Sequence, residues 1–345
     1  MRVFLLTDYR GQFYSSTRAR GAGFDLDSLR AAFDRRGYDT ITLKYADLDL
    51  RAQDFSGENV LYQSSEDPGL LYKDYIEDLL LGMNMLGANL IPRFEYFRAH
   101  HNKIFMEVLR DVTLSPEIGG ARAQSFGTLE DFLRRESDVK LPAVLKPSAG
   151  SKGHGVTIAK DVSSVRRAAK RLARSISLHN LWWRGLHLFD ARGFLRMSNH
   201  RRKFLVQDYV PGLDGDYKVV IYWDRYFVLY RLNRWSSPTA SGSRRYSRPC
   251  PPHAVLDFAE SVMRSFSTPF MALDIGHAFD RCHLFEFQFL CFGQRTIEDA
   301  QCYYERQNGR WVRVSSSPVL EQEFARSVDL YLRNSSAEQA RSQSY

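Results

Sequence analysis

The sequence contains few cysteines, and they are scattered. The four cysteines among the 345 residues are Cys250, Cys282, Cys291 and Cys302, and no two of them form a CxxC pair. A zinc ribbon requires such pairs, and a disulfide framework requires a higher density of cysteines, so both classes are excluded. We expect reduced thiols in a cytoplasmic protein.

Long hydrophobic runs are also missing. The longest apolar stretch, 78–92, is interrupted by Gly82, Asn84, Gly87 and Asn89. It therefore falls short of the roughly 20 apolar residues that a membrane span requires. The first residues contain only a very short apolar run, which predicts a β-strand rather than a signal peptide. We expect no association with a membrane.

The chain does carry an excess of positive charge. It has 48 Lys and Arg against 40 Asp and Glu, giving a net charge of +8. This balance suits an anionic partner such as nucleic acid, a membrane surface or a phosphorylated ligand, but it does not choose between them. The hydrophobic content of 44% is enough for a substantial core, so global disorder is excluded.

Strands and helices alternate in residues 1–98. Apolar runs at Arg2–Thr7, Asp39–Lys44 and Asn59–Gln63 predict strands, and helical periodicity predicts helices at Asp25–Arg36 and Tyr72–Met85. Because strands that alternate with helices form parallel sheets, this segment predicts a small α/β lobe.

The rest of the chain shows no repeat of solenoid length. We predict a helix over Arg93–Arg110, a basic amphipathic helix over Val162–Ile176 and a flexible polar tail from Ser335. The segment 177–202 is rich in Trp, His and Arg and is interpreted as an insertion or lid.

The first motif with chemical meaning is a glycine-rich loop. The predicted strand 141–146 ends in Lys146 and is followed by Gly150, Gly153 and Gly155. Glycines allow backbone N–H groups to wrap phosphate oxygens, and the lysine adds a positive charge for the same anion. No helix opens with GK[ST] after the loop, so it is not a Walker A motif. A plain hairpin turn with incidental lysines remains an alternative.

The second motif is the apolar strand Phe204–Val210, which contains the polar pair Gln207 and Asp208 and is followed by Asp216. The backbone at the end of such a strand can bind the edge of an adenine, and a nearby carboxylate can hold ribose hydroxyls. An ordinary edge strand and turn would have the same pattern.

The third motif combines Asp274 with Glu286 and Gln288 on two predicted strands. If the hairpin is symmetric about Asp280, Asp274 lies opposite Glu286, at a Cβ separation of about 5 Å. Glu286 and Gln288 share a face because strand side chains alternate. Three such oxygen donors suit Mg²⁺ bound together with phosphates. A solvated sheet face is the alternative, but the strand around Glu286 is strongly apolar.

Taken in this order, the three motifs resemble those of the ATP-grasp superfamily, which includes D-alanine–D-alanine ligase and glutathione synthetase. The resemblance covers roughly Asn102 to Gln288. It implies an α/β (α+β) fold in which an N-terminal lobe, 1–98, precedes two subdomains that clamp ATP. The first subdomain would be 99–205, with the loop and the lid insertion. The second, with the metal site, would be 206–334, and a flexible tail, 335–345, would follow.

The resemblance also assigns residues. Lys103 and Lys146 match two phosphate-binding lysines, and Asp216 matches a ribose contact. The ATP-binding residues it implies are Lys103, Lys146, Gly150, Ser151, Lys152, Gly153, His154, Gly155, Gln207, Asp208, Tyr209, Val210 and Asp216. Asp274, Glu286 and Gln288 match the ligands of two Mg²⁺ ions, which Mn²⁺ can replace. The chain departs from the family pattern in two places, because Gln288 replaces the usual Asn and 289–293 replaces a serine-proline-glycine turn.

The activity implied by the resemblance is ATP-dependent ligation of a carboxylate to an amine through an acyl phosphate, with release of ADP and phosphate. Catalysis of this kind depends on positioning and charge neutralisation. Arg231, Arg244 and Lys218 are the candidate catalytic residues, and the stretch Arg231–Arg245 is the candidate substrate wall. The expected partners are a small carboxylate, anionic in character, and an amine or short peptide. Dimers are common in the family.

Three other interpretations remain. The basic helix Arg166–Arg174 would suit a nucleic-acid-binding protein, although no known nucleic-acid motif is present and its spacing fits a solvated face. A non-catalytic ATP-binding regulator would share the fold but would not need both lysines and both carboxylates. A carboxylate–thiol ligase or a sugar kinase would be distinguished by its product. The turn Ser64–Glu66 either contacts the second substrate or caps a helix.

Overall fold

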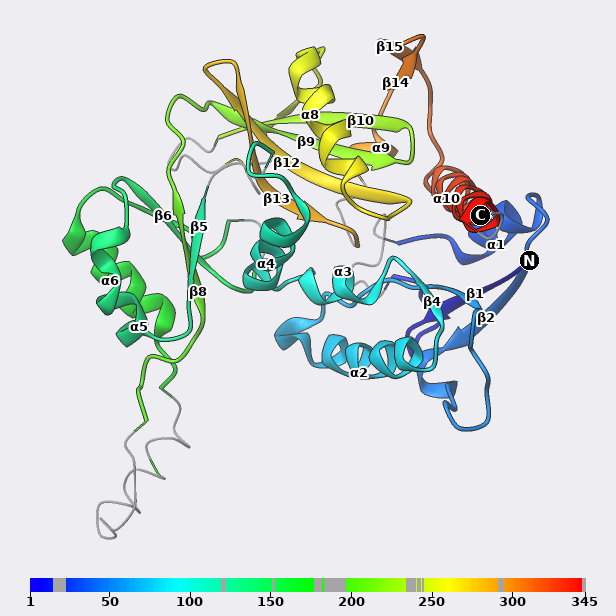
Figure 1. Cartoon of the computed structure of the whole chain (residues 1–345), viewed down its shortest axis with the longest axis horizontal. Coiled ribbons are helices and arrows are strands. Elements are labelled where there is room, and N and C mark those ends of the chain that lie inside the picture. The colour runs from blue at the N-terminus through cyan, green and yellow to red at the C-terminus, as the bar shows by residue number, and fades with distance from the viewer. Residues whose placement is uncertain are drawn as a thin grey trace.

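The computed structural model describes residues 1–14, 23–118, 122–150, 153–176, 182, 197–233, 240, 243, 245–290 and 295–342. Within these residues the chain folds into three β-sheets with helices packed against them (Figure 1). The architecture is mixed α/β, as the sequence predicts. No helix among the described residues is both long enough and apolar enough to cross a membrane.

The N-terminal lobe has a four-stranded parallel sheet in the order β2-β1-β3-β4. Its strands are β1 (Arg2–Thr7), β2 (Asp39–Lys44), β3 (Asn59–Leu61) and β4 (Asn89–Ile91), and its long helices are α1 (Leu26–Asp34) and α2 (Leu71–Met85). The apolar stripe of α2, including Ile76, Leu80 and Met83, is buried against this sheet. The predicted parallel α/β lobe is therefore confirmed.

A pair of short helices joins this lobe to the rest of the molecule. The sequence predicts one helix over Arg93–Arg110, but the structure has α3 (Phe94–Ala99) and α4 (Lys103–Thr113). The helix breaks because His101 has a left-handed backbone conformation, with a φ of 58°. Asn102 then starts α4 as an N-cap, its side chain accepting the N–H of Phe105. The prediction of a continuous helix is wrong at this point.

The second sheet is antiparallel in the order β5-β8-β6-β7 and is covered by two helices. Its elements are β5 (Ala123–Phe126), α5 (Leu129–Arg134), β6 (Ala143–Pro147), β7 (Thr157–Ala159), α6 (Val162–Ala173) and β8 (Phe204–Asp208). Helix α6 buries Val165, Ala168 and Ala169 against the sheet. Its basic residues lie on the outer side, where Arg166 pairs with Glu136 at 2.7 Å. This arrangement matches the predicted solvated face.

The third sheet is the largest, with the order β13-β12-β9-β10-β14-β15 and a short strand beside β10. Its strands are β9 (Gly215–Tyr222), β10 (Arg225–Leu232), β11 (Tyr246–Ser247), β12 (Phe270–Ala278), β13 (Arg281–Gln288), β14 (Cys302–Gln307) and β15 (Arg310–Ser315), and its helices are α8 (His253–Arg264) and α9 (Arg295–Glu298). The predicted boundary at 205/206 falls within β8, and the chain changes sheets after Asp208.

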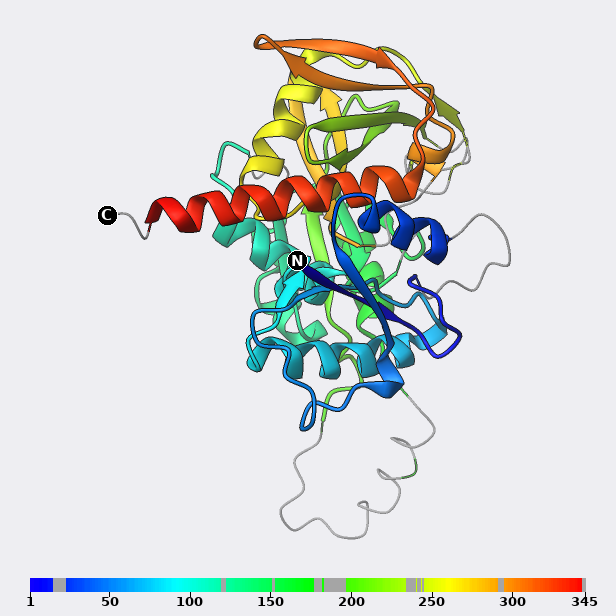
Figure 2. The same cartoon turned by 90° about the vertical axis from the view of Figure 1, so that its right-hand side faces the viewer.

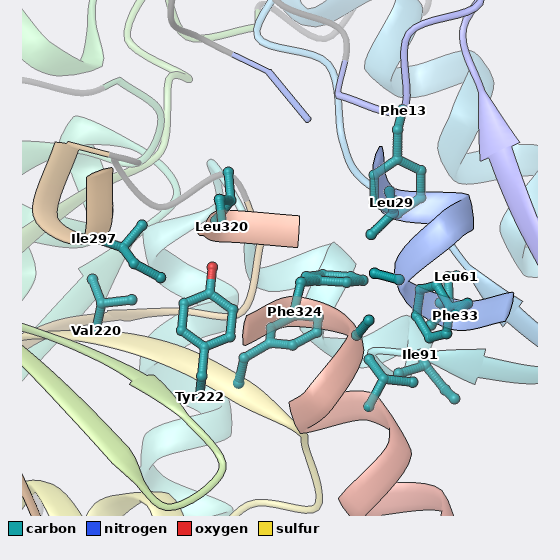
Figure 3. Close-up of a cluster of buried hydrophobic side chains, with 14 of the residues drawn as sticks. Phe13, Leu29, Phe33, Leu61, Ile91, Val220, Tyr222, Ile297, Leu320 and Phe324 are labelled. Atoms are coloured by element: carbon teal, nitrogen blue, oxygen red, sulfur yellow. The ribbon is translucent and has the colours of Figure 1, made fainter. Parts of the chain in front are cut away.

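The last helix, α10 (Leu320–Ser342), lies between the N-terminal lobe and the large sheet (Figure 2). Phe324 is buried there, with its ring centroid 5.7 Å from that of Phe13 and 4.7 Å from that of Phe270. Figure 3 shows Phe324 between Phe13 of the N-terminal lobe and Tyr222 of β9. One apolar core therefore joins the two ends of the chain.

The structure differs from the prediction of a flexible tail from Ser335. Helix α10 continues to Ser342, and the hydroxyl groups of Ser335 and Ser336 each donate to the carbonyl four residues earlier, at 2.9 Å. These bonds satisfy the serine hydroxyls within the helix. A polar composition alone therefore did not predict where the helix ends.

Candidate functional site

One face of the large sheet has an apolar end and a charged end. Because strand side chains alternate, Asp216, Lys218 and Val220 of β9 point to the same face. Val220 belongs to the core around Phe324, whereas Asp216 and Lys218 lie further along the strand. The opposite face of β9 carries Val219, which is buried in the core under α8. Asp216 and Lys218 therefore lie on the face of β9 opposite to the one that Val219 presents to the core under α8.

A β-bulge aligns the two principal carboxylates. In the hairpin of β12 and β13, Ile275 pairs with Leu284 and Asp274 pairs with Glu286, so Phe285 is the extra residue between them. Without the bulge, Asp274 would lie opposite Phe285. Bulges next to functional sites often re-aim a side chain in this way. The predicted pairing of Asp274 with Glu286 is confirmed, although the symmetry assumed for it is not.

Arg231 links two carboxylates of the charged region. Its Nε and Nη2 atoms donate to Asp216 Oδ1 and Oδ2, each at 2.7 Å. Its Nη2 atom also lies 2.7 Å from Asp274 Oδ2, and Lys218 Nζ donates to Asp274 Oδ1 at 3.4 Å. Arg231 and Lys218, both predicted to be catalytic, therefore contact a predicted metal ligand.

The charges in this network stabilise one another. Burial favours the neutral acid at Asp274, but Arg231 and Lys218 outweigh it and hold the pKa of Asp274 well below its usual range. Burial opposes the charge on Arg231, yet Asp274 and Asp216 raise the pKa of its guanidinium. At Asp216, burial has the larger influence and raises the pKa despite Arg231. Asp274 is consequently ionised at neutral pH.

Lys103 reaches the same region from the first turn of α4. Its Nζ atom donates to Glu286 Oε1 at 2.9 Å, and Gln288 Nε2 donates to the same oxygen at 3.1 Å. Burial alone would raise the pKa of Glu286, but Lys103 leads the charges that lower it. The sequence places Lys103 and Glu286 183 positions apart, and the fold brings their side chains into contact.

Lys146 lies on β6 beside the strand that carries the second motif. Its Nζ atom donates to Gln207 Oε1 on β8 at 2.5 Å. Burial, and then the nearby Lys103, lower the pKa of Lys146 to about 8. The predicted phosphate-binding lysine and the predicted adenine-binding strand therefore meet side by side.

The glycine-rich loop joins β6 to β7, which are antiparallel. Gly150 and Gly155 have φ angles of 127° and 77°. A Cβ at Gly155 would lie 3.2 Å from Pro147 Cγ, so this position requires glycine for both conformation and space. His154 is exposed within the loop. Ser151 and Lys152, also predicted to bind ATP, lie outside the described residues.

The predicted adenine-binding segment spans the end of β8. The strand ends at Asp208, whose backbone N–H donates to the carbonyl of Arg122 at 3.0 Å. Tyr209 and Val210 follow outside the strand and are half-buried. The roles assigned to these residues remain predictions, as does the ribose contact of Asp216, whose two oxygens here accept bonds from Arg231.

Part of the predicted substrate wall lies outside the described residues, including Arg244. Arg245 is described, and its Nη1 atom donates to the carbonyl of Asn233 at 2.8 Å. This residue therefore stabilises the backbone at the end of β10.

An ion pair with a buried arginine, which was not predicted from the sequence, lies beside the site. Arg110 of α4 is 3% exposed, and its Nε atom lies 3.0 Å from Glu107 Oε2. Its Nη1 atom donates to the carbonyl of Leu284 at 2.5 Å, which ties α4 to β13. The spacing of three residues on a helix was visible in the sequence, but nothing there indicated that the pair is buried.

Asp274, Glu286 and Gln288 fit a site for a hard cation. In this structure Lys103 contacts Glu286, and Lys218 and Arg231 contact Asp274, so both carboxylates already have cationic partners. Carboxylate and amide oxygens are the donors that Mg²⁺ prefers. Gln288 presents its amide N–H to Glu286, so binding through its oxygen requires a turn of the amide.

Comparisons with known proteins agree with this architecture. No protein-family model matches the sequence, and no curated protein matches it. Among solved structures, D-cycloserine synthetase DcsG matches with a TM-score of 0.55 and 12% identity, over 96% of this chain and 100% of that one. D-alanine–D-alanine ligase from Bacillus anthracis in complex with ATP matches with a TM-score of 0.53 and 13% identity, over 98% and 99%.

An ADP complex of PurK, N5-carboxyaminoimidazole ribonucleotide synthetase, also matches, with a TM-score of 0.50 and 11% identity over 87% of this chain and 73% of that chain. The protein therefore has the ATP-grasp fold that the order of its three motifs predicts. The two lysines and the two carboxylates of the predicted site lie together within that fold.

Proposed function

We propose that the protein is an ATP-dependent ligase that joins a small carboxylic acid to an amine and releases ADP and phosphate. The observation that carries the proposal is the convergence of Lys103 and Lys146 with Asp274 and Glu286. The four residues come from separate elements, and their charges influence one another directly. A likeness in fold to a ligase solved with ATP and a synthetase solved with ADP adds support.

Phosphate oxygens would be bound from two sides. Lys103 at the start of α4 and Lys146 on β6 supply positive charge, and the loop Gly150–Gly155 supplies backbone N–H groups. The adenine would bind along the end of β8. Asp274, Glu286 and Gln288 would hold Mg²⁺, which when bound neutralises charge on the phosphate oxygens.

The reaction would then proceed in two transfers. A carboxylate oxygen of the substrate attacks the γ-phosphorus, and the bond to the bridging oxygen breaks, which leaves an acyl phosphate and ADP. The amine nitrogen next attacks the acyl carbon, loses a proton, and phosphate departs. The protein contributes positioning and charge rather than covalent chemistry.

We assign Arg231 and Lys218 to the positioning of Asp274 rather than to the substrate. Both contact its oxygens, and two nitrogens of Arg231 are already engaged with carboxylates. The positive balance of the chain favours an anionic small molecule, such as an amino acid or sugar acid, as substrate. Short acidic peptides also carry carboxylates and belong to the same class of anionic substrate.

The proposal is tested by analysis of nucleotide products. The protein is incubated with Mg-ATP and pools of acids and amines, and ADP, AMP and phosphate are separated by chromatography. We expect ADP and phosphate that depend on both pools. Glu286→Gln should lower the rate by about 10²–10³-fold, the size of loss seen when one preorganised group that stabilises the transition state is removed.

The matched control is Glu95→Gln, because Glu95 pairs with Arg93 at the surface and lies outside the site. Its rate should equal that of the wild type. AMP and pyrophosphate as products would overturn the acyl-phosphate route. ATP binding without turnover by any pool would favour a non-catalytic regulator.

A further inference from the structure

A second cluster of metal-ligating side chains shares no residue with the proposed Mg²⁺ ligands. One ligand atom each from Glu66, His100 and His101 lies within 4.8 Å of the others. Glu66 belongs to the turn after β3, and the two histidines form the break between α3 and α4. The cluster therefore joins two segments of the chain that are 34 positions apart, counting from Glu66 to His100.

The histidines have unsatisfied nitrogens. His100 is 4% exposed, and neither of its ring nitrogens has a hydrogen-bond partner among the described residues. The Nε2 atom of His101 also lacks such a partner and lies 3.8 Å from Glu66 Oε1. Buried polar groups are almost always paired, so an imidazole with two unpaired nitrogens indicates a missing ligand.

We propose that Glu66, His100 and His101 form a binding site for a divalent transition-metal ion of the zinc class. Imidazole nitrogens suit Zn²⁺, Fe²⁺ and Co²⁺ better than Mg²⁺, which prefers oxygen donors. Two histidines and one carboxylate are a common protein set for such ions and leave a coordination position open. The proposal does not rest on the proposed ligase function.

The distances require only a small adjustment. Tetrahedral Zn²⁺ with bonds of about 2.1 Å draws its ligand atoms to about 3.4 Å from one another. Atoms that now lie within 4.8 Å must therefore approach by about 1.4 Å at most. Glu66 is exposed and can move by changing rotamer, whereas His100 is fixed in the core.

The charges around the cluster permit a cation. Burial lowers the pKa of both imidazoles, and at His101 the neighbouring Glu66 opposes this shift. The positive charges of Lys73 and Lys103 act on both imidazoles. Each ammonium group is paired with a carboxylate, at 3.2 Å to Glu77 and 2.9 Å to Glu286. The charge of each lysine is thus already balanced by a carboxylate, so these lysines do not exclude a cation from the cluster.

The test uses the full-length protein after removal of metals with a chelator. It is dialysed against limiting Zn²⁺ in excess Mg²⁺, and bound zinc is measured by mass spectrometry. We expect one zinc ion per chain, and Co²⁺ in its place should give visible absorption bands. Glu66→Gln and His101→Asn should each weaken zinc binding by about tenfold or more, since even outer-shell changes cost 10–100-fold.

Two control variants separate this site from others. Glu286→Gln alters the predicted Mg²⁺ site, and His253→Gln removes an exposed histidine at the start of α8. Both should retain one zinc ion. The proposal is overturned if the wild type binds no stoichiometric zinc, if both cluster variants bind it normally, or if Glu286→Gln releases it. Thermal melts of the metal-free proteins identify any variant that fails to fold. In that case the Co²⁺ spectrum of the wild type decides whether the cluster binds a metal: visible absorption bands support the proposal, and their absence overturns it.

Discussion

The ammonium group of Lys103 donates a hydrogen bond to Glu286 Oε1 at 2.9 Å, and this contact joins α4 to β13. Both residues are predicted to meet the same ligand, one through its phosphates and the other through a metal. In their present arrangement each satisfies the charge of the other. Binding of Mg-ATP would replace this ion pair with contacts to the nucleotide.

Replacement of Lys103 should weaken ATP binding. We expect Lys103→Gln to raise the KM for ATP by about ten- to a hundredfold, because a hydrogen bond to a charged group contributes about 1.5–3 kcal/mol. The measurement is the initial rate of ADP release as a function of ATP concentration. Lys160→Gln, at an exposed position after β7, should leave the KM unchanged. An unchanged KM in Lys103→Gln would contradict the assigned role.

Arg231 should be important for stability because two carboxylates depend on it. Arg231→Gln would leave Asp216 and Asp274 without their shared partner, and we expect the free energy of unfolding to fall by about 3–5 kcal/mol. Urea denaturation measures this loss. Arg264→Gln removes a surface ion pair with Glu260 and should cost about 1 kcal/mol or less.

A double-mutant cycle tests the contact directly. Asp216→Asn removes one of the two buried negative charges, so the combination with Arg231→Gln should be less destabilising than the sum of the single variants. A coupling energy of about 0.5–3 kcal/mol is typical for residues in one network. Strictly additive effects would show that the two residues act independently.

The affinity for ATP should decrease at alkaline pH. Lys146 has a pKa of about 8, lowered first by burial and then by Lys103. Below that pH the ammonium form predominates and attracts phosphate; above it the amine becomes neutral, so ATP binding must take up a proton. The dissociation constant for ATP should then rise by up to about tenfold per pH unit.

Titration calorimetry between neutral and alkaline pH measures this dependence. Lys146→Arg keeps a positive charge throughout, because arginine is not deprotonated in proteins, and should flatten the profile. If wild type and variant show the same slope above pH 8, Lys146 is not the titrating group.

The ATP-grasp fold was predicted from a resemblance to that superfamily, and the motifs that carry the resemblance are local. The strand before Lys146, the glycines after it and the residues around Glu286 each fall within one hairpin, where alternation and turn residues determine the geometry. The pairing of Asp274 with Glu286 shows the limit of this reasoning. It was predicted from a symmetric hairpin, whereas the structure reaches it through a bulge at Phe285. A bulge leaves no clear signal in one sequence.

Contacts between distant segments could not be predicted. Lys146 meets Gln207 because β6 pairs with β8, which comes from a separate part of the chain. Arg231 of β10 reaches Asp274 of β12 across the intervening strand β9. The break at His101 depends on a left-handed residue inside a segment with helical periodicity, so pattern analysis missed it. The packing of α10 against the N-terminal lobe was also not predicted, because it joins the two ends of the chain.

The core around Phe324 should determine the stability of the whole protein. Its ring contacts Phe13 and Phe33 of the N-terminal lobe and Phe270 of the large sheet, and it is 1% exposed. Phe324→Ala should lower the free energy of unfolding by about 3–5 kcal/mol through the cavity it leaves. Because both lobes share this core, the loss should be the same by urea denaturation whether fluorescence or circular dichroism is followed.

The matched control is Val319→Ala, one residue before α10. Val319 is 53% exposed, and its truncation should change the free energy of unfolding by about 0.5 kcal/mol or less. A similar loss in both variants would mean that the contacts of Phe324 contribute little. Two separate transitions in Phe324→Ala, with a single one in the wild type, would instead show that this side chain couples the unfolding of the two lobes.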